Sequence, residues 1–176
     1  PLKAAGRPFT ILIEQRLDYS PWVPEGFGTG DLVIVSGHCI WVRDFKYGTG
    51  VPVPSEENYQ MMLYGLGAYN ELSIAYDDIR EIDVGIVQPR IGNNSSWRTT
   101  LDNLLAWGDL VKPIADKAFA GEGDFVPGDH CDTGFCRGRA VCKARASACL
   151  DATAGLASAD TLSPAEIADL LPKLDG

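Results

Sequence analysis

One stretch constrains the fold of this chain more than any other: residues 28–46, which read GTGDLVIVSGHCIWVRDFK. Two apolar runs rich in β-branched residues, 32–35 and 40–42, flank the turn signal Ser36-Gly37. This pattern predicts two strands joined in a tight hairpin. The acidic residues and the lysine of the stretch lie at the far ends of the two strands, away from the turn.

The register of the hairpin decides what those charged residues can do. A two-residue turn pairs Ser36 with Cys39 and, counting outward, sets Asp31 opposite Asp44. Carboxylates directly opposite on one face repel, so a divalent cation between them is the natural resolution. Side chains alternate along a strand, and Lys46 therefore shares a face with Asp44. A slip of one residue would put Asp31 on the other face.

The remaining periodicity predicts an α/β fold. A chain of 176 residues can bury one core. We expect four further elements: a strand over 9–19, a helix over 55–72 capped by Ser55, a strand over 79–87, and a helix over 101–120. The first strand completes an antiparallel three-strand meander with the hairpin. The strand after the crossover helix is expected to lie parallel to the strand before it.

These elements divide the chain into a core over residues 1–120 and a Cys-rich, helical C-terminal region over residues 121–176. In the helix over 101–120, Pro113 is expected to kink or break the chain. Its core candidates are Leu104, Leu105, Trp107, Val111, Ile114 and Phe119. The chain begins with Pro1 rather than methionine, which suggests an internal fragment.

Three polar residues outside the hairpin are candidates for the acidic site. Gln60 and Tyr64 are four apart and so lie on one face of the predicted helix, where they are expected to touch the site. The alternative is a partly buried tyrosine with a chance glutamine neighbour. Glu14 either reaches the same site or is a solvated strand residue.

Charge and hydropathy restrict the partners. The formal net charge is −9 and the pI is near 4.6, which argues mildly against nucleic acid. A basic cluster and one strand-end arginine are nevertheless candidates for phosphate contacts: Arg137, Arg139, Lys143 and Arg145, with Arg90. No apolar run approaches about 18 residues, so we expect a cytoplasmic protein with no membrane partner.

Four of the five cysteines lie close together, at positions 131, 136, 142 and 149. In a cytosolic protein, Cys131, Cys136, Cys142 and Cys149 favour an iron–sulfur or zinc site over disulfides. Their spacing is not that of a standard zinc ribbon or finger. The other reading is a set of reduced cysteines on a short helical appendage.

The order of these motifs resembles the RecB-type branch of the PD-(D/E)xK nuclease superfamily, which includes CRISPR-associated exonucleases. Residues 28–31 are similar to the Gly-x-x-Asp strand of that branch, residues 44–46 to its (D/E)-x-Lys, and residues 60–64 to its Gln-x-x-x-Tyr helix. Cys136 and Cys142 resemble its C-terminal cluster ligands. Residues 45–48, 54–60 and 87–90 also resemble an uncharacterised phage and prophage family of the same superfamily.

The resemblance implies a restriction-endonuclease-like core and metal-dependent hydrolysis of DNA, as an exonuclease of phage or prophage origin. Asp31, Asp44 and the Phe45 carbonyl would hold Mg²⁺ or Mn²⁺. Lys46 would orient the attacking water, and Gln60 with Tyr64 would position substrate or nucleophile. Implied partners are DNA and phage recombination or replication proteins, in a bacterial host.

The cysteine segment departs from the branch in two respects. Cys131 and Cys136 have four residues between them rather than two, and the N-terminal helix that supplies a further ligand in the branch is not evident before residue 9. A 4Fe-4S cluster is therefore expected only if another residue, such as Cys149, substitutes. The rival functions are a non-catalytic nucleic-acid or protein-binding module and a structural zinc protein.

Overall fold

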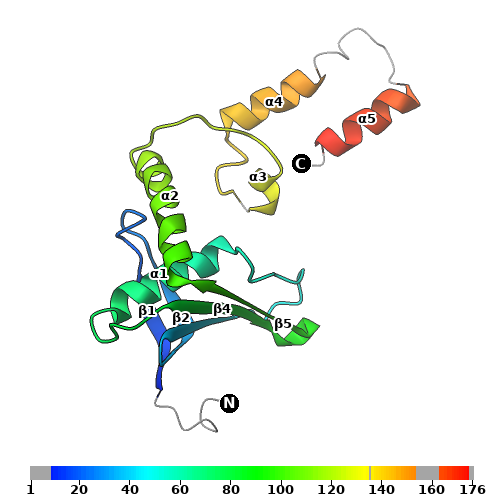
Figure 1. Cartoon of the computed structure of the whole chain (residues 1–176). Coiled ribbons are helices and arrows are strands. Elements are labelled where there is room, and N and C mark those ends of the chain that lie inside the picture. The colour runs from blue at the N-terminus through cyan, green and yellow to red at the C-terminus, as the bar shows by residue number, and fades with distance from the viewer. Residues whose placement is uncertain (1–8, 135, 154–162, 175–176) are drawn as a thin grey trace. The chain divides into compact units, whose positions relative to one another are not determined.

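The structure is a computed structural model that describes residues 9–134, 136–153 and 163–174 (Figure 1). The chain forms two compact units, unit 1 over Pro1–Glu122 and unit 2 over Gly123–Gly176. Unit 1 is an α/β domain with a five-stranded mixed sheet in the order β1-β2-β3-β4-β5. The predicted α/β class is confirmed, and all residues of the predicted acidic site belong to this unit.

The first three strands form the predicted antiparallel meander. They are β1 (Thr10–Asp18), β2 (Phe27–Ser36) and β3 (Cys39–Phe45). The hairpin has the two-residue turn that the sequence predicts, because Ser36 pairs with Cys39 and Leu32 pairs with Arg43. At the turn, Gly37 has φ of 58°, a conformation that glycine adopts without steric cost. The residues that follow in this register are Asp31 and Asp44.

Helix α1 (Tyr59–Leu72) connects the meander to β4 (Glu81–Gln88), which is parallel to β3 as expected. The predicted cap was wrong. Asn58 caps the helix by accepting a hydrogen bond from the Met61 N–H at 3.2 Å, whereas Ser55 is buried in the preceding turn. Both residue types favour the position before a helix, so only the fold distinguishes them.

A fifth strand was not predicted. After the 3₁₀ turn η2 (Pro89–Ile91), β5 (Asn93–Thr100) pairs antiparallel with β4 at the edge of the sheet. Its sequence, NNSSWRTT, contains one large apolar residue and therefore no alternating apolar pattern. The strand exists because the exposed edge of β4 offers it a complete hydrogen-bonding ladder.

Helix α2 (Leu101–Phe119) follows at once, with the Thr100 side chain accepting from the Asn103 N–H. The helix continues through Pro113, so no break occurs there. Leu104 is buried as predicted, but Ile114 and Phe119 are exposed. Those two predictions were wrong because only the first part of the helix packs on the sheet domain.

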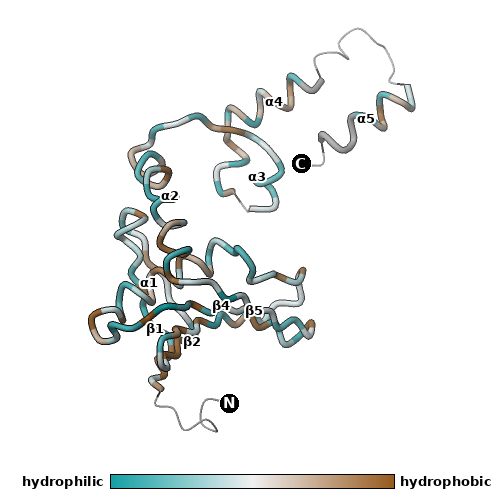
Figure 2. Tube along the Cα trace, viewed as in Figure 1, coloured by the Kyte–Doolittle hydropathy of each residue, from teal (hydrophilic) through white to brown (hydrophobic). Residues whose placement is uncertain are grey.

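The core of unit 1 lies between the sheet and α1, which packs across β1 to β4 (Figure 1). Hydrophobic stretches follow the strands (Figure 2), and Val33, Val42 and Val84 are fully or almost fully buried. Helix and sheet approach closely at Gly67, where an added Cβ would stand 2.9 Å from the Leu17 Cβ. This close packing fixes the position of α1 over the strand ends.

Unit 2 contains three helices among its described residues: α3 (His130–Thr133), α4 (Lys143–Thr153) and α5 (Pro164–Leu174). Ser163 caps the start of helix α5. Ser163 and Glu166 exchange hydrogen bonds in a capping box, which lowers the pKa of the Glu166 carboxyl. Within the described part of the chain, no helix has the length and apolarity required to cross a membrane.

Candidate active site

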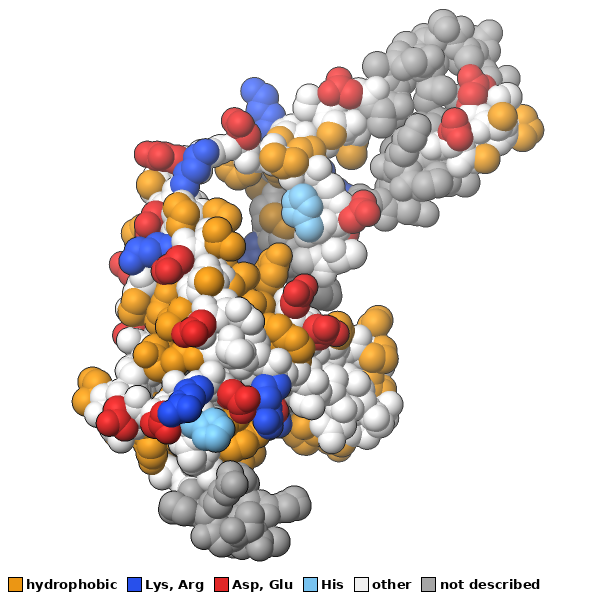
Figure 3. Space-filling model, in the orientation of Figure 1, with side chains coloured by type: hydrophobic (Ala, Val, Ile, Leu, Met, Phe, Trp, Pro, Cys, Tyr) orange, Lys and Arg blue, Asp and Glu red, His pale blue; other side chains and the backbone are white. Residues whose placement is uncertain are grey.

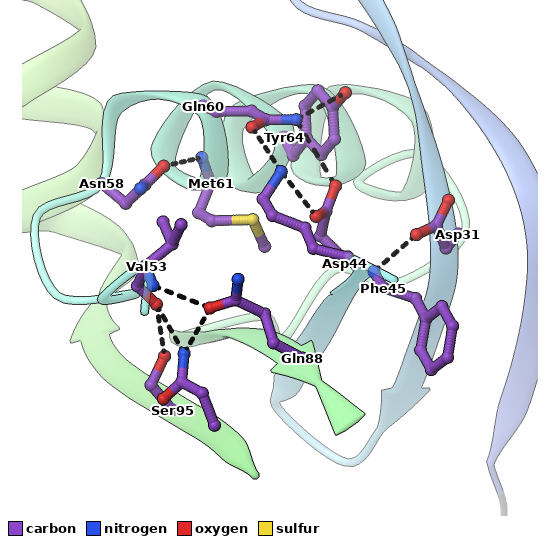
Figure 4. Close-up of polar contacts among 12 residues, drawn as sticks. Asp31, Asp44, Phe45, Val53, Asn58, Gln60, Met61, Tyr64, Gln88 and Ser95 are labelled. Carbon is purple, nitrogen blue, oxygen red and sulfur yellow. Dashed lines mark hydrogen bonds and ion pairs between the residues drawn. The ribbon is translucent and has the colours of Figure 1, made fainter. Parts of the chain in front are cut away.

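The predicted acidic site lies at the end of β3 that is far from the hairpin turn, beside the middle of β2 (Figure 4). Asp44 is the last inward-facing residue of β3 and is only 7% exposed. Its carboxylate accepts from the Lys46 ammonium at 2.9 Å. Lys46 remains in line with the sheet because its backbone N–H donates to the Val87 carbonyl at 2.9 Å. Asp44 and Lys46, which are two positions apart, therefore lie on the same face of the sheet and pair with each other.

Asp31 joins the site from β2. Its Oδ2 accepts a hydrogen bond from the Phe45 backbone N–H at 2.6 Å. In Figure 4 the carboxylates of Asp31 and Asp44 extend from neighbouring strands on the side where α1 lies. The Phe45 ring points away, is exposed, and stacks on Tyr47 with centroids 6.1 Å apart. The Phe45 carbonyl stays a predicted metal ligand.

The ladder between β1 and β2 is interrupted opposite Asp31. The pairs on either side are Ile13 with Leu32 and Gln15 with Gly30. Between them, Glu14 has φ of 53°, which is unusual for a residue other than glycine in a strand. Glu14 is exposed. The strained backbone of Glu14 therefore lies in the part of β1 that is next to Asp31.

Helix α1 completes the site with the polar pair predicted from the sequence. The Gln60 amide donates to the Asp44 Oδ1 at 3.4 Å and to the Tyr64 hydroxyl at 3.2 Å, and its Oε1 accepts from Lys46 at 3.2 Å. A single glutamine therefore holds the acid, the lysine and the tyrosine in place. The structure brings Gln60 and Tyr64 into one network with Asp44 and Lys46, and the functional roles of the pair stay predictions.

The packing around position 28 explains why the residue three positions before Asp31 is a glycine. A Cβ at Gly28 would overlap the ring of Tyr64. The tyrosine can lie over β2 only because position 28 has no side chain. In the Gly-x-x-Asp motif of β2, the glycine thus makes room for the Tyr64 ring and the aspartate supplies the carboxylate.

A second polar network, which the sequence did not assign to the site, anchors the connector before α1. Gln88 is almost fully buried at the end of β4, and its Oε1 accepts from the Val53 N–H and the Asn93 amide, each at 2.7 Å. Asn93 and Ser95 donate to the Val53 carbonyl. The available signal was a glutamine directly after the apolar run 84–87. These bonds hold the start of α1, and with it Gln60, beside the acids.

The candidate phosphate-binding residues are divided between the two units. Arg90 lies over the Tyr47 ring, with its guanidinium carbon 5.3 Å from the ring centroid. Arg137, Arg139 and Lys143 belong to unit 2, where Arg139 pairs with Asp132 at 2.8 Å. Arg145 also pairs with Asp132, at 3.2 Å. The basic cluster is thus partly neutralised within its own unit.

The four cysteines of unit 2 differ in their exposure to solvent. Cys131 is buried in α3, Cys136 is exposed, and Cys142 and Cys149 are partly buried. In the residues that the structure describes, no three His, Cys, Asp or Glu side chains form a group that could hold a metal. The cysteines as placed do not fit a cluster, and an iron–sulfur or zinc centre in this segment stays a prediction.

The chain was compared with known protein families. A family model described as "Protein of unknown function (DUF2800)" matches residues 2–176, almost the whole chain. The match spans both units, so the acidic hairpin, the Gln60–Tyr64 helix and the cysteine segment all lie within the region that the family shares.

Proposed function

The chain belongs to the DUF2800 family, and we propose that it is a metal-dependent nuclease that hydrolyses DNA phosphodiesters. One observation carries the proposal: the Asp44 carboxylate pairs with Lys46 at the end of β3, Asp31 on the neighbouring strand accepts from the Phe45 N–H, and Gln60 of α1 contacts both Asp44 and Lys46. Paired acids with an adjacent lysine are suited to phosphoryl chemistry, because they hold a cation beside a fixed positive charge.

The topology of unit 1 supports a restriction-endonuclease-like core. An antiparallel meander, a crossover helix and a parallel fourth strand place Asp31 of β2 and Asp44 of β3 on neighbouring strands that α1 packs against. In this arrangement the acids lie on a rigid sheet and the polar pair lies on a packed helix. The motif order predicts that the enzyme acts on linear DNA as an exonuclease.

The donor set of the site fits Mg²⁺ or Mn²⁺. Both ions prefer oxygen ligands, and magnesium is commonly held by one or two carboxylates, with water and substrate phosphate completing its coordination. Asp31 and Asp44 would hold the ion. When bound, a divalent ion supplies positive charge that activates water and offsets the negative charge that builds on the phosphate.

The other residues of the site have separable tasks. The Lys46 ammonium places a compact positive charge where the phosphate becomes more negative, and it orients the attacking water. Gln60 fixes the Lys46 ammonium and the Asp44 carboxylate relative to each other. The Tyr64 hydroxyl accepts the second hydrogen of the Gln60 amide, which restricts that side chain to one orientation.

The test is degradation of linear duplex DNA by the purified chain in the presence of Mn²⁺. Lys46→Ala should lower the rate by on the order of 10²–10³-fold, the usual cost of removing one preorganised transition-state contact. Arg80→Ala removes an exposed charge from the other end of β4 and should leave the rate unchanged. Equal rates for Lys46→Ala and wild type would refute the assignment.

A further inference from the structure

A cavity of about 480 Å³ opens beside the first turn of α1, on the side that faces α2 and β5. Three aromatic residues from three elements line it: Tyr59 of α1, Trp97 of β5 and Trp107 of α2. Tyr59 and Trp107 lie with ring centroids 5.9 Å apart. The volume is within the range of pockets that bind small organic groups.

This cavity is not a remnant of core packing. The Tyr59 side chain is 72% exposed although it is aromatic, and Leu110 at the rim is 70% exposed. Apolar side chains gather over α2 on the surface of unit 1 (Figure 3). An open aromatic wall of this kind costs solvation free energy unless a ligand covers it.

The polar groups of the lining indicate what the ligand is. Thr99 and Asn103 place a hydroxyl and an amide at the cavity, and neither side chain makes a hydrogen bond to another described residue. The one charged lining residue is Glu57, which has φ of 49° and so a strained backbone at the rim. A carboxylate repels phosphate but accepts hydrogen bonds from exocyclic amino groups.

Position connects the cavity to the acidic site. Tyr59 and Gln60 are successive residues in the first turn of α1, and successive helical side chains diverge by about 100°. Gln60 reaches the Asp44 carboxylate, while Tyr59 reaches Trp107. One helical turn therefore contacts both the acids and the aromatic wall.

We propose that this cavity is a stacking pocket for a nucleobase of single-stranded DNA, whose backbone continues to the Asp31–Asp44 site. The proposal rests on the nuclease function and specifies its substrate: a strand with at least one unpaired base. Aromatic rings stack on any base, and the free amide and hydroxyl bind base edges, while Glu57 keeps the phosphate outside the pocket.

The experiment is fluorescence anisotropy of a labelled deoxycytidylate oligomer titrated with the full chain in EDTA, where no hydrolysis occurs. Tyr59→Ala should weaken binding by about 5- to 150-fold, which corresponds to about 1–3 kcal/mol for one stacked base. Phe119→Ala is the matched control, because it removes an aromatic ring that is also exposed but lies outside the cavity. It should bind like wild type.

A ligand control separates stacking from charge. An oligomer of the same length with abasic residues should bind wild type more weakly, and Tyr59→Ala should weaken it no further. The proposal is overturned if Tyr59→Ala binds the cytidylate oligomer as wild type does, or if the abasic oligomer binds equally well. Duplex degradation that depends on Lys46 would leave the nuclease function standing in that case. Conversely, if binding depends on Tyr59 but no DNA is hydrolysed, the stacking pocket is supported and the nuclease function is rejected.

Discussion

The acidic site of unit 1 and the cysteines of unit 2 hold their candidate ligands in different ways. Backbone ladders fix the strands β2 and β3 on which Asp31 and Asp44 lie. The Phe45 N–H holds the Asp31 carboxylate, and Gln60 of α1 holds that of Asp44. In unit 2, Cys131 lies on a four-residue helix, and Cys136 lies in an exposed turn. Each region has ligand-type residues at suggestive spacings, but only in the first do they lie on neighbouring paired strands.

The difference shows what positions a ligand when no ion is bound. Register in a sheet follows from the apolar pattern of the strands and is the same with or without a metal. A segment with few buried apolar contacts has no comparable constraint, so a metal that bound there would bind as the segment folds. The sheet of unit 1 thus fixes the backbone of Asp31 and Asp44 before any ion binds, whereas a metal centre of unit 2 would have to order its own ligands.

The largest expected effect separates the two regions by activity. Asp44→Asn should lower Mn²⁺-dependent degradation of linear DNA by on the order of 10²–10³-fold, since it removes a carboxylate at the reacting centre. Cys142→Ser should leave the rate at the same order of magnitude as wild type. Far-UV circular dichroism of both variants controls for folding. An equal loss in Cys142→Ser would show that the two regions act as one site.

A smaller effect distinguishes the cysteines themselves. Burial of the Cys39 thiol on β3 raises its pKa to about 11, and the nearby Asp83 and Glu81 carboxylates also raise it. A raised thiol pKa keeps the proton on sulfur, so at pH 8 the reactive thiolate is roughly 100-fold scarcer than for a thiol of pKa 9.0. Iodoacetamide at pH 8 should therefore modify the exposed Cys136 long before Cys39.

Mass spectrometry of each site as a function of pH and of added zinc sharpens this result. Modification of Cys39 should rise steadily as the pH approaches 11, and zinc should leave it unchanged. If unit 2 orders around zinc, Cys136 and Cys142 become protected. Rapid modification of Cys39 at pH 8 would contradict its buried position in the sheet.

The smallest effect concerns the packing that holds the acidic site. Gly28→Ala introduces a Cβ that overlaps the Tyr64 ring, and it should lower the free energy of unfolding by about 1–3 kcal/mol. At Gly48 the nearest atom to an added Cβ is 4.0 Å away, so Gly48→Ala should change stability by less than about 0.5 kcal/mol. Urea denaturation measures both. Equal stabilities for the two variants would mean that Tyr64 is not held against β2.

The elements that could be predicted are those whose own sequence carries a strong apolar or turn pattern. The hairpin was predictable because β-branched runs flank a Ser36-Gly37 turn, and the Ser36–Cys39 register then fixed the two acids. Strand β5 was not predictable, because its polar sequence is stabilised by the edge of β4 rather than by its own apolar face. The cap of α1 was assigned to Ser55 instead of Asn58 for a related reason: the connector is positioned by the distant Gln88.

The candidate site divides in the same way. Gln60 and Tyr64 were predictable from helical spacing, and their hydrogen bond follows from that spacing. The aromatic cavity was not, because Tyr59, Trp97 and Trp107 come from three elements whose contact is a property of the packed domain. Local periodicity identifies residues that share an element, whereas sites built between elements require the tertiary structure.

Isothermal titration of the chain with Mn²⁺ tests the central claim most directly, because the claim is that Asp31 and Asp44 together form a cation site. Wild type should bind a single ion, and Asp31→Asn and Asp44→Asn should each abolish that binding. Asp78→Asn, which removes an exposed carboxylate elsewhere in unit 1, should bind as wild type does. Unchanged Mn²⁺ affinity in Asp44→Asn would contradict the account.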